Sequence, residues 1–139
     1  MSSPATWPSG SIPLRLQLDA TASTVAFPLT DGATSWNSVA QSALNDWNAA
    51  LTRSQFAATT GSAGAAINNR GDTVNQVFFA TTVYGDFFDS RTLAVTAGFT
   101  NRATARFSEQ DVVFNSNLAW DSYRGPLRGS TRDLRRVAL

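Results

Sequence analysis

Residues 35–51 read SWNSVAQSALNDWNAAL, and this stretch decides the fold. Its apolar residues recur at helical spacing, with Trp36, Ala43 and Trp47 on one face. Thr34 or Ser35 can cap the first turn by accepting from a free backbone N–H. Two indoles on one face give the helix a wide apolar surface to cover. We therefore predict a long amphipathic helix over 35–51 that packs on a sheet.

Strands are expected on both sides of this helix. Residues 11–19 and 91–100 alternate apolar with polar or small side chains, which predicts strands with one buried face. Residues 74–82 contain a continuous apolar run typical of an interior strand. Shorter strands are predicted near Phe56 and over residues 111–115, and the outward small residues of 91–100 favour an edge position.

The last nine residues, 131–139, read as the start of a second helix. Thr131 can cap it and Asp133 lies in its first turn, but no stop signal follows. The predicted fold class is therefore α+β, a twisted mixed β-sheet of about five strands with one long amphipathic helix packed on it and an incomplete C-terminal helix. The length of 139 residues fits one domain over 1–139.

The composition excludes several functions. A net charge of +1 gives no field that would gather nucleic acid, and no apolar run is long enough for a membrane span. The chain contains no Cys and no His. It therefore cannot form a disulfide, a zinc site of the usual nitrogen and sulfur type, a Cys nucleophile or a Ser-His-Asp triad from its own residues.

Five segments, taken in order, resemble the upper subdomain of the matrixin-like metzincins, a family of secreted zinc metalloproteases. They are IPLRLQL at 12–18, DGATSWNSVA at 31–40, TLAVT at 92–96, DVVFN at 111–115 and DLRRVAL at 133–139. In that family the last segment continues into H-E-x-x-H-x-x-G-x-x-H, which supplies three zinc ligands and a general base. The resemblance implies an extracellular zinc-dependent endopeptidase of which this chain is a fragment, inactive alone and a monomer when complete.

The resemblance also implies a binding site for a peptide or protein substrate. Leu93, Ala94, Val95 and Thr96 would form the edge strand against which an extended peptide lies antiparallel, by strand addition. Many matrixins place a structural-zinc His in this strand, and Val95 stands at the matching position. Zinc is thus the expected cofactor of a full-length member, with no ligand contributed by this chain.

A calcium site is a further possibility carried by the resemblance. Asp86 and Asp89, with Ser90 beside them, lie in a loop like those that bind calcium in the family, and carboxylate oxygens suit a hard cation. The competing interpretation, which we favour, is that these aspartates cap turns of their own backbone.

Three other groups have a functional and a structural interpretation, and the structural one is favoured for each. Glu109 and Asp111 could form an acid/base pair or be solvated charges at a strand edge. Trp36 and Trp47 could stack on sugar or pack in the core. Five arginines could bind phosphate or line a solvated connection and helix face. They are Arg124, Arg128, Arg132, Arg135 and Arg136.

Three hypotheses for the whole chain remain. The first is a truncated metzincin-like protease domain, and the second is a non-catalytic peptide-binding or structural module on the same scaffold. The third is an unrelated all-β secreted domain with one helix. The coding sequence beyond Leu139 separates the first two, since the first predicts His-Glu-x-x-His there.

Overall fold

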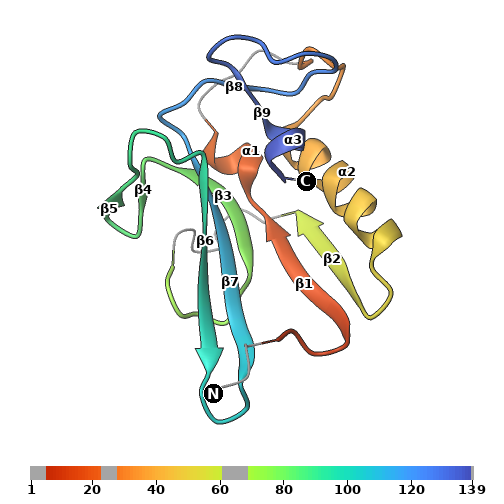
Figure 1. Cartoon of the computed structure of the whole chain (residues 1–139), viewed down its shortest axis with the longest axis vertical. Helices are drawn as coiled ribbons and strands as arrows, with labels where there is room; N and C mark the ends of the chain where they lie inside the picture. Colours follow the sequence, from red (N-terminus) through yellow and green to blue (C-terminus); the bar gives the residue numbers. More distant parts are fainter. Residues whose placement is uncertain (1–5, 23–27, 61–68, 139) are drawn as a thin grey trace.

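The computed structural model describes residues 6–22, 28–60 and 69–138. Twelve elements follow one another along these residues (Figure 1). In chain order they are β1 (Gly10–Leu16), α1 (Leu18–Thr21), α2 (Trp36–Ala50), β2 (Ser54–Thr60), β3 (Gln76–Ala80), β4 (Thr82–Val83), β5 (Asp86–Phe87), β6 (Ala94–Asn101), β7 (Arg106–Asn115), β8 (Trp120–Asp121), β9 (Arg132–Asp133) and α3 (Leu134–Ala138).

Five of the strands form one mixed sheet in the order β2-β1-β3-β7-β6. The first four run parallel to one another, and β6 alone is antiparallel to its neighbour β7. β1 meets β3 through only two register pairs, Arg15 with Gln76 and Leu16 with Val77. This arrangement confirms the predicted fold class, an α+β fold with a mixed sheet of five strands and one long helix.

Helix α2 begins and ends where its sequence indicates. The Ser35 side chain accepts a hydrogen bond from the Ser38 N–H at 3.0 Å, which satisfies one of the free donors of the first turn. Trp36 and Val39 are buried against the sheet. Figure 1 shows α2 on the side of β1 and β2, away from β6.

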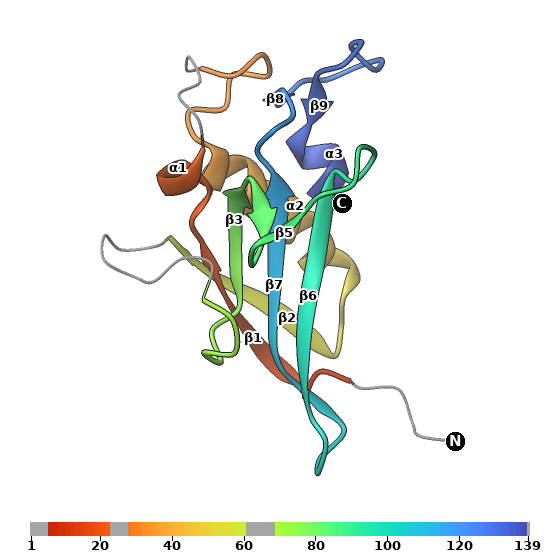
Figure 2. The ribbon, with the colours of Figure 1, turned by 90° about the vertical axis from the view of Figure 1, so that its left-hand side faces the viewer.

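The hydrophobic core lies between α2 and the sheet. Alternation along the strands turns Leu14 and Leu16 of β1, Val77 of β3 and Phe114 of β7 toward this layer, where they form one buried cluster with Trp36. Aromatic rings continue the cluster at the end of the sheet where β3 and β7 finish, and Figure 2 shows β8 and β9 beyond that end.

Several local predictions were wrong. The strand expected over 11–19 ends at Leu16 and gives way to α1, whose first amide, that of Leu18, donates to Asn37 Oδ1 at 2.9 Å. Part of the loop expected around Asp86 and Asp89 pairs as the β4–β5 hairpin. At the C-terminal end, Arg132 and Asp133 pair with β8, so α3 begins at Leu134 and Thr131 does not cap it.

Candidate functional site: an open strand edge beside an apolar groove

Strand β6 lies at one edge of the sheet, as the sequence predicts (Figure 2). Its partner β7 pairs with one side, and no described strand pairs with the other side. The Leu93 carbonyl accepts from the Asn115 N–H at 2.9 Å, so residue 93 faces β7 with its backbone groups. Because antiparallel pairs alternate between bonded and non-bonded, the backbone groups of Ala94, Thr96 and Gly98 face the free edge.

The side chains of Ala94 and Thr96 point to the face of the sheet that α2 covers. Ala94 lies opposite Phe114 and Thr96 lies opposite Val112. Thr96 and Gly98 are exposed to solvent. Gly98 has a packing role, because a Cβ there would come within 3.2 Å of the Gln110 side-chain nitrogen. Ala94, Thr96 and Gly98 thus bring no charge and no large side chain to this edge.

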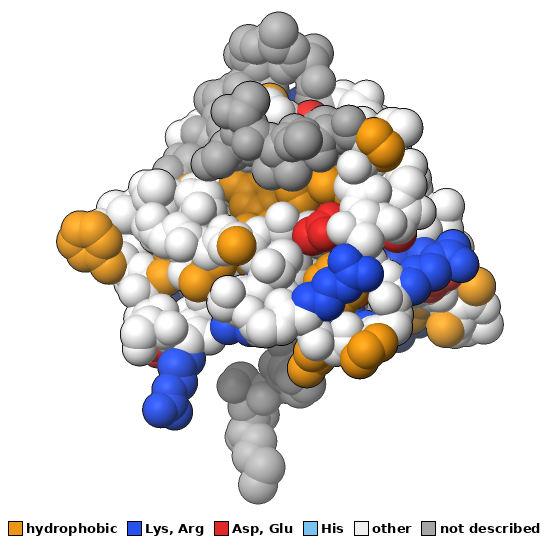
Figure 3. Space-filling model, turned by 90° about the horizontal axis from the view of Figure 1, so that it is seen from above, with side chains coloured by type: hydrophobic (Ala, Val, Ile, Leu, Met, Phe, Trp, Pro, Cys, Tyr) orange, Lys and Arg blue, Asp and Glu red, His pale blue; other side chains and the backbone are white. Residues whose placement is uncertain are grey.

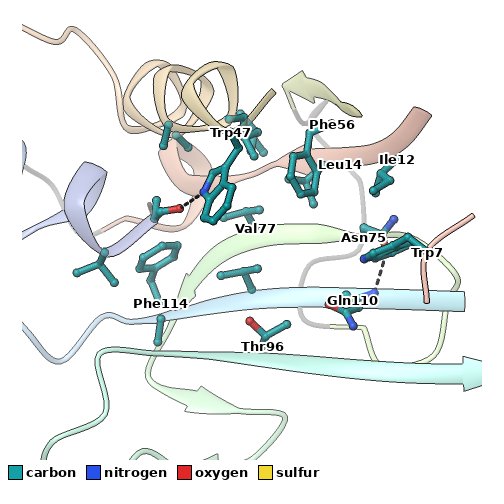
Figure 4. Close-up of a pocket in the computed structure, with 18 of the residues that line it drawn as sticks. Trp7, Ile12, Leu14, Trp47, Phe56, Asn75, Val77, Thr96, Gln110 and Phe114 are labelled. Atoms are coloured by element: carbon teal, nitrogen blue, oxygen red, sulfur yellow. Dashed lines mark hydrogen bonds between the residues drawn. The ribbon is translucent and has the colours of Figure 1, made fainter. Parts of the chain in front are cut away.

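A groove of about 920 Å³ lies between α2 and the sheet and reaches from β1 and β2 across β3 and β7 to the start of β6 (Figure 4). Its wall on α2 is formed by Ala43, Leu44 and Trp47, and its floor includes Val77 and Phe114. Its rim is formed by Thr92 and Leu93, which directly precede β6, and by Ala94 and Thr96 of β6. None of the residues that line the groove is charged.

Trp47 forms the wall of this groove instead of packing in the core. Its side chain is 40% exposed, whereas Trp36 on the same helix is 1% exposed. The Trp47 indole N–H donates to the Ala138 carbonyl at 3.2 Å, which joins α2 to the end of α3 (Figure 4). The predicted core role therefore holds for Trp36 and is wrong for Trp47. The groove itself was not predicted, because helical periodicity does not reveal how much of a sheet one helix covers.

Three of the four residues predicted to bind substrate lie together in the structure. Leu93, Ala94 and Thr96 lie together on the rim of the groove. Val95, the next residue in the alternation, turns to the opposite face of the sheet. Peptide binding by these residues remains a prediction.

On that opposite face, Glu109 and Asp111 are fully buried, so the expectation of solvated strand-edge charges was wrong. The Glu109 carboxylate accepts from the N–H groups of Gly71 at 2.8 Å and Thr73 at 2.6 Å. Asp111 accepts from the Gln76 N–H at 2.8 Å and from the Tyr84 hydroxyl. These carboxylates fasten the 71–76 segment and the β4–β5 hairpin to the sheet.

This buried group carries shifted pKa values. Burial raises the pKa of Asp111, and hydrogen bonds from Tyr84 and Gln76 partly offset that increase. Burial and the neighbouring Asp111 raise the pKa of the Tyr84 hydroxyl well above its ordinary value. Thr73 and Tyr84, which both bond to these carboxylates, have positive φ angles of 67° and 52°. These hydrogen bonds join strand β7 to the 71–76 segment and to the β4–β5 turn, so the two carboxylates position these loops.

The predicted metal positions do not form a cluster. Asp86 and Asp89 are exposed, and Asp89 Oδ1 accepts from the Arg91 N–H at 2.7 Å, which is the turn-capping role. Across residues 6–22, 28–60 and 69–138, no group of three or more His, Cys, Asp or Glu residues converges in a way that could hold a metal ion.

The late arginines do not form one anion site. Arg135 pairs with Asp46 at 2.7 Å, and Arg136 donates to the Gly125 carbonyl at 2.8 Å. Arg128 and Arg136 both lie over the Tyr123 ring, at 4.8 and 5.8 Å from its centroid. In Figure 3 the basic side chains form separate patches among neutral and acidic atoms. Arg128, Arg135 and Arg136 thus have local partners, in agreement with a structural interpretation of these three residues.

Comparison with known proteins adds no relative. No family model, no curated protein and no solved structure matches this chain. Among the described residues, no helix is both long and apolar enough to cross a bilayer.

Proposed function

We propose that this chain is the peptide-binding part of a secreted, extracellular zinc-dependent endopeptidase, whose zinc ligands lie on residues outside this sequence. The observation that carries the proposal is β6, the one antiparallel strand of the five-stranded sheet, which lies at its edge with the backbone groups of Ala94 and Thr96 turned outward. An extended peptide can add to such an edge as one more strand, through main-chain hydrogen bonds.

The groove supports the same assignment. A peptide strand beside β6 places alternate side chains on the groove face, next to Ala94 and Thr96. That face has no charged lining residue, so apolar side chains are favoured there and a charged side chain would lose hydration without a partner. The preferred peptide is therefore extended, with apolar side chains at alternate positions.

Catalysis would require groups that this chain does not contain. In the family that the sequence resembles, zinc acidifies a bound water, which attacks the peptide carbonyl. With no His and no Cys in the sequence, this chain contributes only the orientation of the peptide.

The second candidate is a non-catalytic peptide-binding module on the same scaffold. The complete absence of His and Cys from the sequence favours it, because the common zinc ligands are then missing. Both candidates use the same edge, and they differ only in whether peptide is cleaved when residues beyond Leu139 are present.

Binding is tested with a labelled, extended peptide carrying apolar residues at alternate positions, measured by fluorescence anisotropy. The matched control is the same peptide N-methylated on the amides that would pair with β6, which removes the donors but keeps the side chains. We expect binding of the first peptide only. Equal binding of both would refute strand addition.

Hydrolysis is tested separately. We expect this chain to show no cleavage of the peptide with added Zn²⁺ above a chelated control. Chelator-sensitive turnover by this chain alone would overturn the assignment of the zinc ligands to other residues. Reading the coding sequence past Leu139 then separates the two candidates, since His-Glu-x-x-His there supports the protease and an in-frame stop supports the module.

A further inference from the structure

The free edge of β6 lacks the features with which soluble proteins protect exposed strands. Such edges are usually blocked by charged side chains, Pro or a bulge in the middle of the strand. Residues 94–101 read AVTAGFTN, without charge or Pro, and the one irregularity in the β6–β7 register falls late, between Phe99 and Thr100. The first part of β6 is therefore regular, uncharged and open to pairing.

This edge is also complementary to itself. The outward backbone groups belong to Ala94, Thr96 and Gly98, which are evenly spaced along the strand. If a second β6 lies antiparallel about a two-fold axis at Thr96, then Thr96 faces the same residue of the other copy. Ala94 then faces Gly98, so a methyl group lies opposite a residue with no side chain and nothing collides. Each of these pairs can exchange N–H to carbonyl hydrogen bonds in both directions.

We propose that β6 pairs with β6 of a second copy of this chain, so that two sheets join into one across a two-fold axis. The dimer then occupies the edge that a peptide would use, and the two compete. This competition rests on the proposed function, whereas the dimer itself does not. A second copy has one advantage over a peptide, since its β6 strand is already ordered and loses little conformational freedom on pairing.

Charge at the ends of the strand opposes this pairing only weakly. In the same register, Arg91 of one copy comes near Asn101 and Arg102 of the other. Arg91 and Arg102 are exposed and lie outside the paired stretch, so solvent and salt screen their repulsion. The central pairs around Thr96 therefore decide whether the dimer forms.

A charge-swap experiment tests the register directly, because Thr96 faces itself across the axis. Thr96→Glu places two carboxylates opposite each other, and Thr96→Lys places two ammonium groups there. Like charges directly opposite on paired strands repel, so we expect each variant alone to dimerise about five- to tenfold more weakly than the parent chain. An equimolar mixture of the two should recover the association as a mixed dimer. Thr96→Val, which keeps the backbone N–H and the size of the side chain, is the matched control and should dimerise like the parent.

Sedimentation velocity over a range of concentrations gives the dimer fraction for each chain, and far-ultraviolet circular dichroism verifies that each is folded. A parent chain that stays monomeric at all concentrations overturns the proposal. So does a dimer that neither single charge weakens, since it would use another surface. Should a variant fail to fold, hydrogen exchange on the parent chain decides, because the Thr96 amide must gain protection as concentration rises.

Competition is measured by adding the labelled alternating peptide to the parent dimer. We expect the peptide to dissociate the dimer as it binds. Dimerisation that follows the charge-swap pattern while the peptide binds nothing refutes the proposed function and leaves the dimer standing. Peptide binding to a chain that never dimerises refutes the dimer and leaves the proposed function standing.

Discussion

Replacing Glu109 by Gln should release the 71–73 segment from the sheet. The carboxylate accepts from the N–H groups of Gly71 and Thr73 through its two separate oxygens, at 2.8 and 2.6 Å. Gln keeps one oxygen and presents an NH₂ group to the other N–H, which then has no acceptor. Hydrogen bonds to charged groups contribute about 1.5–3 kcal/mol each, so losing one predicts a fall of about 2 kcal/mol in the free energy of unfolding.

Part of this loss of stability should be confined to the 71–73 segment. Thr73 is held at a positive φ of 67°, a conformation that non-glycine residues rarely adopt, so the loop relaxes when its bond is lost. Urea unfolding followed by tryptophan emission gives the global change, and amide hydrogen exchange at Gly71 and Thr73 gives the local one. We expect faster exchange at these two amides than the global change alone would cause.

Ser108→Ala is the matched control, because Ser108 precedes Glu109 on the same strand and is exposed. It should alter the unfolding free energy by less than about 0.5 kcal/mol. A Glu109→Gln chain that is as stable as this control, with unchanged exchange at Gly71 and Thr73, would refute the view that the buried carboxylate fastens the loop.

Three further predictions concern stability. Burial raises the folded-state pKa of Asp111 above its ordinary 3.8, so the folded protein binds this proton more tightly than the unfolded chain does. The resulting gain in the free energy of unfolding is complete below about pH 4 and is lost as pH rises through the folded-state pKa. Unfolding at a series of pH values should therefore show the parent losing stability with rising pH relative to Asp111→Asn, and parallel curves would contradict this. Trp36→Ala should lower the free energy of unfolding by about 3–5 kcal/mol, because the residue is 1% exposed and its ring centroid lies 5.7 Å from that of Phe79. Trp47 is 40% exposed, so Trp47→Ala should lower the free energy of unfolding clearly less in the same urea titration. Ser35→Ala should cost about 1 kcal/mol by removing the cap of α2, with Ser35→Asp as the variant expected to restore it in thermal melts.

The elements that could be predicted from sequence are those in which a periodic pattern of apolar residues continues over many positions. Over α2 the apolar spacing runs for four turns, and the alternation from Leu93 to Phe99 marks β6 and its small outward face. Such patterns depend only on which face of one element is buried, so they survive without knowledge of the partner. The edge position of β6 followed from the same reasoning.

The parts that could not be predicted depend on partners distant in sequence. Glu109 lies between the polar residues Ser108 and Gln110, as a solvated strand residue would, and its real partners are backbone amides of residues 71 and 73. Segments as short as β4, β5, β8 and β9, each of two residues, carry no periodicity at all. The groove depends on how far α2 extends across the sheet, which is a property of the assembled layers.

The short contact between β1 and β3 has a consequence for how the chain assembles. β1, α1, α2 and β2 follow one another along the chain on one side of this contact, and β6 and β7 form a hairpin on the other, so each half can form from neighbours in sequence. Asn75, the residue just before β3, bridges the two halves. Its side chain donates to the Pro13 carbonyl at 2.8 Å and accepts from the Gln110 N–H at 2.7 Å. Asn75 thus adds to the backbone bonds that join Arg15 and Gln17 to the β3 side, and partial opening of the molecule should start at this short junction.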